Sequence, residues 1–335
     1  MTRLPVIALA LLLAGLAPAR AAPAEDEEAT LALPAITFAF VPAYIAEDMG
    51  YWAKRGLKMK QTVITGIGAM NAVLSKSVEF SISSMPTVIR ANVRGQKVIA
   101  IGGAFEGTAV EVVMRKDMAS AAGITESSPV ATRAQALKGK TVAMLAPNTI
   151  VHGYLRYFAK KGGLDPERDF KIAIMSQEAS IAALEGNSVD AMAQVLPYST
   201  IAIHNGTAMM LSSGPRGEFP ELNPFALNGI TAVPGYCESH ASVCKKMVGG
   251  YHEAMLYLLD HPAESAAILK KRIPNMDEAA FDDGFAMTRK WTPRTMKMSD
   301  AGLAHAQELM VIGGMLKEDE KLKSFHEIYT NAYAE

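Results

Sequence analysis

Two short stretches, far apart in the chain, carry nearly the same sequence: LSKSVEF at residues 74–80 and LEGNSVDA at residues 184–191. Each stretch ends a helical pattern, turns on small polar residues and enters an apolar strand directly after an acidic residue, Glu79 or Asp190. The repetition predicts two similar α/β lobes. Because a cleft between two lobes commonly binds a small molecule, it also points towards ligand capture.

Alternating strand and helix patterns surround both copies. In the first half, a strand pattern at 31–40 is followed by a helix pattern at 42–55 and a second strand pattern at 57–64. After a Ser/Ala/Gly-rich stretch at 119–129, the alternation restarts with a strand pattern at 141–145. This order predicts, in each lobe, a mostly parallel sheet flanked by helices.

Breaks in the pattern predict where the chain passes between the lobes. One crossing is expected near Lys116, and a second near Pro215 in a breaker-rich stretch. Two crossings make the first lobe discontinuous, and such crossings can act as a hinge. The expected division is a signal peptide at 1–21, lobe 1 at 30–115 plus 226–335, and lobe 2 at 116–225.

The length of the chain and its balance of charge limit the classes of protein to which it can belong. With 335 residues, the chain is long enough for two domains that each bury a core. Its 33 basic and 34 acidic side chains nearly balance, and no basic run is long enough to neutralise a row of phosphates. We therefore expect no nucleic-acid partner.

The first residues predict export. Arg3 supplies a positive start, an apolar run follows at 6–17, and Ala19-Arg20-Ala21 forms a small-x-small cleavage site. The apolar run is shorter than the roughly 20 residues that span a bilayer, which favours a cleaved signal peptide over a membrane anchor. The mature protein is expected in the periplasm.

The two cysteines, Cys237 and Cys244, both belong to the exported part. In an oxidising compartment they are expected to form a disulfide, with a turn bringing their Cα atoms within range. Two free buried thiols are the alternative. Only His240 lies between them, so no metal site is expected.

One glycine-rich turn needs a separate interpretation. Thr65-Gly66-Ile67-Gly68 follows a strand and resembles the start of a dinucleotide fingerprint, but Asn71 stands where the third glycine is required. We therefore expect no dinucleotide cofactor, and no other cofactor. Gly66 instead predicts a tight turn that lets the backbone approach a ligand.

Two helix starts are expected to face the cleft. Asn148 is placed to cap the helix that follows Thr149, and Ser84, next to Ser83, is placed to cap a helix with Pro86 in its first turn. Free amides in such first turns favour a polar or anionic ligand group. A helix cap without a ligand is the ordinary alternative.

Aromatic and polar side chains near these turns complete the candidate site. Phe40, Tyr44 and Met85 are expected to hold an apolar or flat ligand body, although core packing is the alternative. Gln194 and Tyr198, at the end of a strand in the second lobe, are expected to add polar contacts. No catalytic motif such as a nucleophile elbow, a Walker loop or a zinc-protease helix is present, which argues against an enzyme.

With these residues in view, the chain resembles the exported substrate-binding proteins of nitrate/sulfonate/taurine-type ABC importers, which are related to the thiamine-pyrimidine synthases. The likeness covers about residues 36–213 and rests on several phrases together. These phrases lie at 46–52, 55–57, 77–80, 95–98, 137–142, 182–186 and 189–191.

The resemblance implies a two-lobed periplasmic-binding-protein fold of type II, with a ligand held in the cleft and delivered to a membrane permease. We expect a small organic ligand, an ABC permease in the inner membrane as the partner, and a monomeric protein. Within the family, Ser83, Ser84 and the loop of Asn148 and Thr149 fall at positions that commonly contact ligand. Sulfonate-type members carry Gly-Ser at that loop, and Met85 here is apolar, so the departure disfavours sulfonate and taurine.

Two other functions remain open on the sequence. An exported carrier of a lipid-like ligand, or a partner-binding protein with the same fold, would have a large methionine-lined pocket, whereas an importer component would have a small pocket ringed by amides. A pyrimidine-synthase-like enzyme is more distant, because the cysteine-rich motif of those synthases is absent.

The disulfide gives a direct test. Thiol titration of the denatured, unreduced protein should find no free thiol, because Cys237 and Cys244 are expected to be paired. Two free thiols would contradict the pairing.

Overall fold

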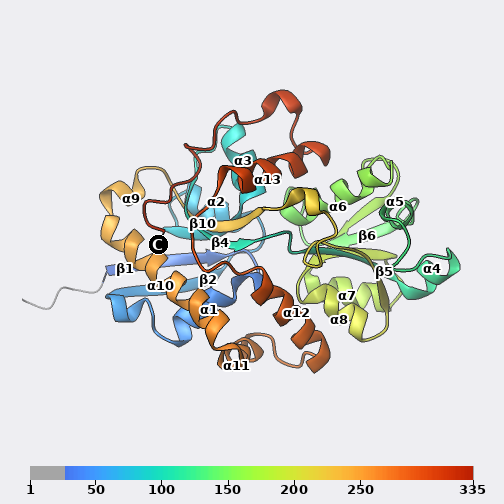
Figure 1. The fold of residues 1–335 in the computed structure, drawn as a ribbon, viewed down its shortest axis with the longest axis horizontal. Coiled ribbons are helices and arrows are strands. Elements are labelled where there is room, and N and C mark those ends of the chain that lie inside the picture. Colours follow the sequence, from blue (N-terminus) through green and yellow to red (C-terminus); the bar gives the residue numbers. More distant parts are fainter. Residues whose placement is uncertain (1–26, 335) are drawn as a thin grey trace, which may run out of the picture.

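Two five-stranded sheets, one in each half of an elongated molecule, organise the fold in the computed structural model (Figure 1). The structure describes residues 27–334, so the predicted signal peptide lies outside the described residues. The first sheet has the strand order β2-β1-β3-β10-β4. Its strands are β1 (Glu27–Leu33), β2 (Leu57–Val63), β3 (Phe80–Ser84), β4 (Ile99–Glu106) and β10 (Ala226–Ala232).

The second sheet repeats this arrangement in the order β7-β6-β8-β5-β9. In each sheet one strand, β10 or β5, pairs antiparallel with both neighbours, and the other four strands share one direction. Each sheet is therefore mixed but mostly parallel, as the sequence predicts. Its strands are β5 (Val110–Arg115), β6 (Thr141–Met144), β7 (Lys171–Ile174), β8 (Ala191–Val195) and β9 (Ala208–Ser213).

The repeated sequence stretches enter β3 and β8, the central strands of the two sheets. In both lobes the acidic residue before this strand accepts a hydrogen bond from a threonine N–H on the parallel neighbouring strand, β1 or β6. Glu79 Oε2 lies 2.7 Å from the nitrogen of Thr30, and Asp190 Oδ2 lies 2.7 Å from the nitrogen of Thr141. Each carboxylate thus satisfies a backbone donor just before the strands begin to pair at Leu31↔Phe80 or Val142↔Ala191.

The turn before each acidic residue is also built twice. Lys76 and Asn187 both adopt a left-handed conformation, with φ of 59° and 60°. The next residue, a serine in each copy, donates its N–H to a helix carbonyl at 2.8 Å. The sequence repeat is therefore a repeat of one helix–turn–strand connection, which confirms the prediction of two similar lobes.

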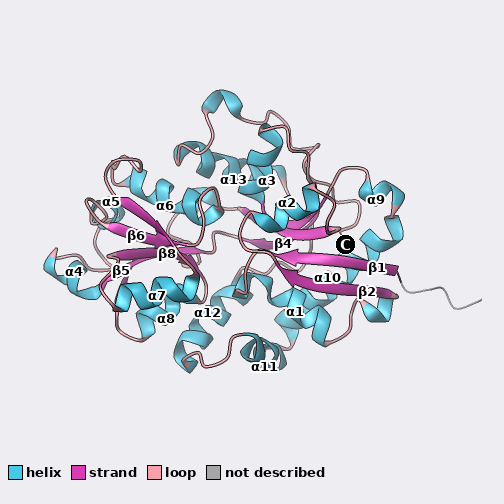
Figure 2. Cartoon of the chain, turned by 180° about the vertical axis from the view of Figure 1, so that it is seen from behind, coloured by secondary structure: helices cyan, strands magenta, loops and turns pink. Residues whose placement is uncertain are grey.

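Helices cover both faces of each sheet (Figure 2). In the first lobe, α1 packs on α10 and α3 packs on α13, and in the second, α7 packs on α8 and α5 on α6. The helices are α1 (Val41–Asp48), α2 (Gly68–Leu74), α3 (Met85–Val93), α4 (Lys116–Ala121), α5 (Val130–Gln135), α6 (Ile150–Lys161), α7 (Gln177–Glu185), α8 (Tyr198–His204), α9 (Tyr236–Ser239), α10 (Ala241–Asp260), α11 (Pro262–Arg272), α12 (Glu278–Lys290) and α13 (Asp300–Ile312).

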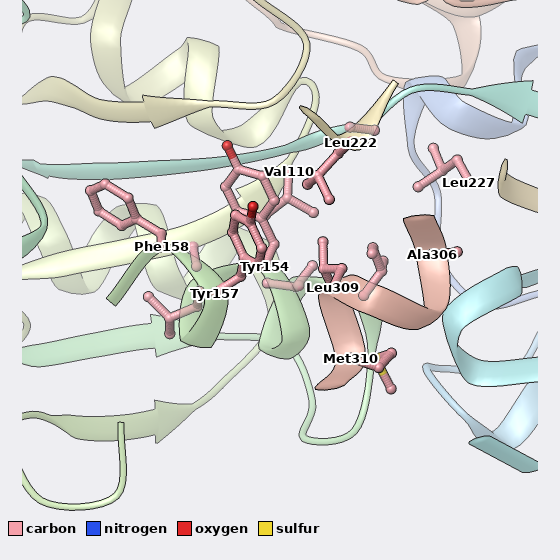
Figure 3. Close-up of a cluster of buried hydrophobic side chains, with 14 of the residues drawn as sticks. Val110, Tyr154, Tyr157, Phe158, Leu222, Leu227, Ala306, Leu309 and Met310 are labelled. Atoms are coloured by element: carbon pink, nitrogen blue, oxygen red, sulfur yellow. The ribbon is translucent and has the colours of Figure 1, made fainter. Parts of the chain in front are cut away.

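Two C-terminal helices connect the lobes. α13 packs on both α3 and α6, and its Leu309 and Met310 lie beside Tyr154 of α6 in one continuous apolar cluster (Figure 3). α12 packs on α8, and its Asp283 forms an ion pair of 2.5 Å with Arg216 of the second lobe. The lobes therefore share buried apolar surface as well as the covalent crossings.

The first crossing lies earlier than predicted. Residues 110–115 were expected in lobe 1, but β5 pairs with β8 and β9 of the second sheet, so the chain crosses between Glu106 and Val110 rather than near Lys116. A strand pattern does not show which sheet the strand joins, because either sheet accepts the same apolar residues.

Glu111 lies in β5, directly after the first crossing, and its carboxyl is buried. Ser199 and Ser213 each donate a hydroxyl to one of its oxygens at 2.5 Å, and burial raises the pKa of Glu111. Ser213 ends β9 and leads into the return crossing, so the two connections between the lobes meet at this carboxyl.

Further local findings concern two segments of the first lobe. Residues 38–40, predicted as part of a strand, form a 3-10 helix, because Pro42 in the first turn of α1 follows directly and fixes a helical backbone. The predicted disulfide between Cys237 and Cys244 is present and joins α9 to α10. Within residues 27–334, no helix is long and apolar enough to cross a membrane.

The repeated carboxylate contact predicts a matched pair of stability effects. Asp190→Ala and Glu79→Ala should each lower the free energy of unfolding by about 1–3 kcal/mol, because a partly buried N–H loses its acceptor. Asp190→Asn and Glu79→Gln keep an acceptor oxygen and should lose much less. Urea unfolding measures the difference.

The control for this prediction is Glu126→Ala, which removes an exposed acidic residue away from the connection and should change stability by less than about 0.5 kcal/mol. Equal effects of all three alanine variants would show that the contact does not stabilise the central strands.

Candidate functional site

A cavity of about 120 Å³ lies between the lobes, where the carboxyl ends of strands from both sheets meet. The segments that follow β1 and β6 and the ends of β3 and β8 contribute to its wall. The carboxyl ends of strands are the usual place for a ligand in open α/β sheets. Its lining is mostly apolar. The lining residues are Pro34, Ala35, Thr37, Ala39, Phe40, Gly66, Ile67, Ala69, Met70, Ile82, Ser83, Ser84, Thr87, Ala109, Leu145, Thr149, Ile150, Val151, Gln177, Gln194, Val195, Leu227 and Asn228.

Three buried polar atoms of this lining have no hydrogen-bond partner. They are Thr37 Oγ1, Gln194 Oε1 and Asn228 Oδ1, on side chains that are 1%, 0% and 5% exposed. Buried polar atoms are nearly always paired in folded proteins, because an unpaired one loses its bonds to water without replacement. Their gathering in one cavity indicates a place for a polar ligand group.

The orientation of the Gln194 amide follows from its neighbours. Ser180 donates its hydroxyl proton to the carbonyl of Ser176 at 2.8 Å, so its oxygen can only accept from Gln194. Gln194 Nε2 donates to that oxygen at 3.0 Å. The amide nitrogen is therefore committed to Ser180, and Oε1 is left as a free acceptor.

The two helix starts that were predicted to face the cleft do line the cavity, but their caps differ from the prediction. Thr149, not Asn148, is the N-cap of α6, and its Oγ1 accepts from the N–H of His152 at 3.5 Å. Asn148 takes the left-handed turn before the cap, with φ of 62°, a conformation that asparagine tolerates.

Ser84 does precede α3, and Pro86 does lie in its first turn. Its hydroxyl does not cap the helix, however, and bonds Thr87 Oγ1 at 2.7 Å instead. Neighbouring Ser83 is held by Ser81 and Thr231 at 2.8 and 3.2 Å.

Six of the predicted contact residues line the cavity and four do not. Those that line it are Phe40, Gly66, Ser83, Ser84, Thr149 and Gln194, and those that do not are Tyr44, Met85, Asn148 and Tyr198. Met85 is fully buried in the apolar core, where its position at the first turn of α3 directs it.

Tyr44 and Tyr198 hold the cavity wall instead of lining it. The Tyr44 hydroxyl accepts from the N–H of Thr37 at 3.3 Å, and burial raises its pKa. The Tyr198 hydroxyl, from the second lobe, donates to the carbonyl of Ile36 in the first lobe at 3.0 Å. Both tyrosines therefore fix the loop that carries Thr37.

The lobes are in contact around the cavity. Besides the Tyr198 bond, the N–H of Phe38 donates to the carbonyl of Leu196 across the cleft at 3.3 Å. On another side, a side chain at Gly66 would begin 3.4 Å from the Cβ of Ala146, so the turn at Gly66 approaches the second lobe closely. The structure is therefore a closed arrangement of the two lobes.

Sequence reasoning missed Thr37 and Asn228. Asn228 stands alone as an amide in the apolar strand ALNGITA, which is a signal that a buried polar contact is needed there. Thr37 carries no such signal, because it looks like any residue of a connecting loop. Its importance comes from the way Tyr44 and the second lobe place it.

The described lining of the cavity carries no formal charge. Among the described residues that line the cavity there is no Asp, Glu, Lys, Arg or His. Nearby His152 lies behind the lining, and burial, followed by the positive charge of Arg156, lowers the pKa of His152 to about 4. Its Nδ1 accepts from the N–H of Asn148 at 3.2 Å, so it acts as a neutral acceptor in the turn.

Two lobes with a cavity between the carboxyl ends of their sheets define the periplasmic-binding-protein fold. Residues 37–265 match the NMT1/THI5-like family, and the chain belongs to that family. Among curated proteins, no sequence relative of the chain is found.

Solved structures with the same fold are distant in sequence. The alkanesulfonate-binding protein SsuA from Xanthomonas axonopodis pv. citri, bound to MOPS, has 18% identity and a TM-score of 0.71 over 92% of this chain and 100% of that chain. The periplasmic nitrate-binding protein NrtA from Synechocystis PCC 6803 has 14% identity and a TM-score of 0.69 over 92% and 87%. The desulfurization enzyme DSZB has 15% identity and a TM-score of 0.61 over 92% and 97%.

The position of His152 predicts a pH dependence of stability. Its pKa is lowered from 6.5 to about 4 in the folded protein, so the unfolded chain takes up the proton first as the pH falls. The stability that neutral His152 contributes is complete above about pH 6.5 and is lost between about pH 6.5 and 4.

Thermal unfolding across this pH range should show a flatter dependence for His152→Gln than for the unchanged protein. The exposed His326 offers the control, and His326→Gln should keep the original dependence. An identical pH dependence in all three proteins would rule out His152 as the cause.

Proposed function

We propose that this protein is the solute-binding component of an ABC-type importer, which captures a small organic ligand in the cavity between its lobes in the periplasm and delivers it to a membrane permease. The observation that carries the proposal is the cavity itself, in which unpaired buried polar atoms from both lobes converge. The family and the fold of the solved binding proteins support the same function.

The ligand would act as a bridge between the lobes. Thr37 and Asn228 belong to the first lobe and Gln194 belongs to the second, so one molecule that bonds all three favours the closed arrangement. Opening at this side of the cleft would break two single hydrogen bonds, from Phe38 to Leu196 and from Tyr198 to Ile36, and each of these costs little to break. The contacts of α12 and α13 with the second lobe would have to adjust to the opening.

The cavity favours this function over a carrier of a lipid-like molecule. Its volume of about 120 Å³ is small, and Met70 is the one methionine among the described lining residues. A lipid chain would need a longer and wider apolar space.

The cavity also favours binding over catalysis. DSZB shows that enzymes share this fold, so the fold alone does not decide the matter. The described lining, however, contains no histidine or carboxylate that could act as a base for its serine and threonine hydroxyls, and the Nδ1 of neighbouring His152 is occupied by the N–H of Asn148.

Native mass spectrometry of the mature protein from the periplasm of its own cells tests the proposal. A small molecule should co-purify with the unchanged protein and be absent from Ala35→Trp, because an indole at the cavity wall fills the space for the ligand. Ala53→Trp, at an exposed position far from the cavity, is the matched control and should retain the molecule.

Small-angle scattering completes this test. Removing the bound molecule should increase the radius of gyration, and restoring it should reverse the change, since the ligand holds the lobes together. Equal retention of the molecule by both tryptophan variants would place the binding site elsewhere.

A further inference from the structure

One unpaired polar atom of the cavity is fixed as a hydrogen-bond acceptor. Gln194 Oε1 is an amide oxygen, which accepts and never donates. The arrangement of Ser180 and Ser176 fixes this oxygen as the atom without a partner. The Asn228 amide and the Thr37 hydroxyl can each donate or accept. A ligand that satisfies Gln194 Oε1 must bring an N–H or O–H group.

An oxyanion does not meet this requirement. A nitrate, carboxylate or sulfonate group has only acceptor oxygens, which would face Gln194 Oε1 without a proton between them. Such an anion would also need compensation for the loss of water, and no cationic side chain is found among the described residues of the lining. The helix starts at α3 and α6 offer partial positive charge, but they do not remove the acceptor of Gln194.

Other groups of the lining suit a ligand carbonyl. The hydroxyls of Ser84 and Thr87 bond each other at 2.7 Å, so one of their two protons is left to donate to a ligand oxygen. The hydroxyl of Thr149 is not such a donor, because it donates to the carbonyl of Ala146 at 3.0 Å. A donor at the start of α3 and the acceptor of Gln194 match a group that combines C=O with N–H.

The rest of the lining sets the size and polarity of the ligand body. Phe40, Met70, Ile82, Ile150 and Leu227 present apolar surface. The volume of about 120 Å³ is comparable with the roughly 150 Å³ apolar cavity that takes up benzene. A body of about one ring is therefore expected.

From these observations we infer that the ligand is uncharged, carries a carboxamide-like or urea-like group that donates a hydrogen bond to Gln194, and has a compact apolar body. This inference rests on the proposed function, because it names the class of ligand for the same cavity.

Three probes of similar size separate the chemical requirements. Benzamide is neutral and donates hydrogen bonds, methyl benzoate is neutral and does not donate, and benzoate is an anion. Affinities are measured by isothermal titration calorimetry with the mature protein, after removal of bound small molecules. Benzamide should bind at least about tenfold more tightly than methyl benzoate or benzoate. About a tenfold loss of affinity is expected when a buried acceptor is left unpaired.

A variant identifies the acceptor. Gln194→Leu should weaken benzamide about tenfold and leave methyl benzoate unchanged, because it removes the acceptor oxygen but little volume. Gln61→Leu is the matched control. Like Gln194, Gln61 donates a hydrogen bond from Nε2, here to the carbonyl of Ala43 at 2.9 Å, and its Oε1 is unpaired. Unlike Gln194, it lies outside the cavity. It should leave the affinity for both probes unchanged.

Each outcome bears on one inference. Binding of benzoate or benzenesulfonate as tight as that of benzamide, or an equal loss of both neutral probes in Gln194→Leu, would overturn the assignment of ligand class while solute capture stands. Failure of all probes to bind would overturn the inference of a compact carboxamide-like ligand. Whether the protein captures a solute at all is then decided by the presence or absence of a co-purified small molecule in native mass spectrometry. A co-purified oxyanion would likewise refute the ligand class and uphold the function.

Discussion

In each lobe, a backbone N–H of one strand, β1 or β6, donates a hydrogen bond to the acidic residue that precedes the central strand, β3 or β8. This contact sets the geometry of the lobe. Glu79 and Asp190 accept from the N–H of Thr30 and Thr141 at the same distance, 2.7 Å, and so fix where the central strand joins the sheet. The register of that strand decides where it ends. Because β3 and β8 end at the cleft, this contact also decides which side chains reach the cavity.

The site depends on contacts between the lobes as much as on the lobes themselves. Tyr44 and Tyr198 place the loop of Thr37 from opposite sides of the cleft, and α13 buries apolar side chains against both lobes. Three side chains that each have an unpaired polar atom are thereby buried around one small space. An unpaired buried polar atom lowers the stability of the folded protein, and it is a source of binding energy for a ligand that supplies the missing hydrogen-bond partner.

Much of the fold follows from patterns of sequence, and less of the site does. The repeat at 74–80 and 184–191 predicted two similar lobes, and the alternation of strands and helices predicted mostly parallel sheets. Phe40, Gly66 and Gln194 were found because they stand at the ends of predicted strands or in turns. The side chains of Met85 and Tyr44 could not be placed in this way, because an apolar residue beside a cleft is equally suited to the core.

By itself the sequence determined the two α/β lobes and the near balance of charge, and it favoured the pairing of Cys237 with Cys244, because these depend on local periodicity, composition and spacing. Only the tertiary structure decided that β5 joins the second sheet, that Thr37, Asn228 and Gln194 line one cavity, and that no charged side chain of the described lining faces it. These features join residues up to 191 positions apart, from Thr37 to Asn228, and such contacts arise from packing that no local pattern encodes.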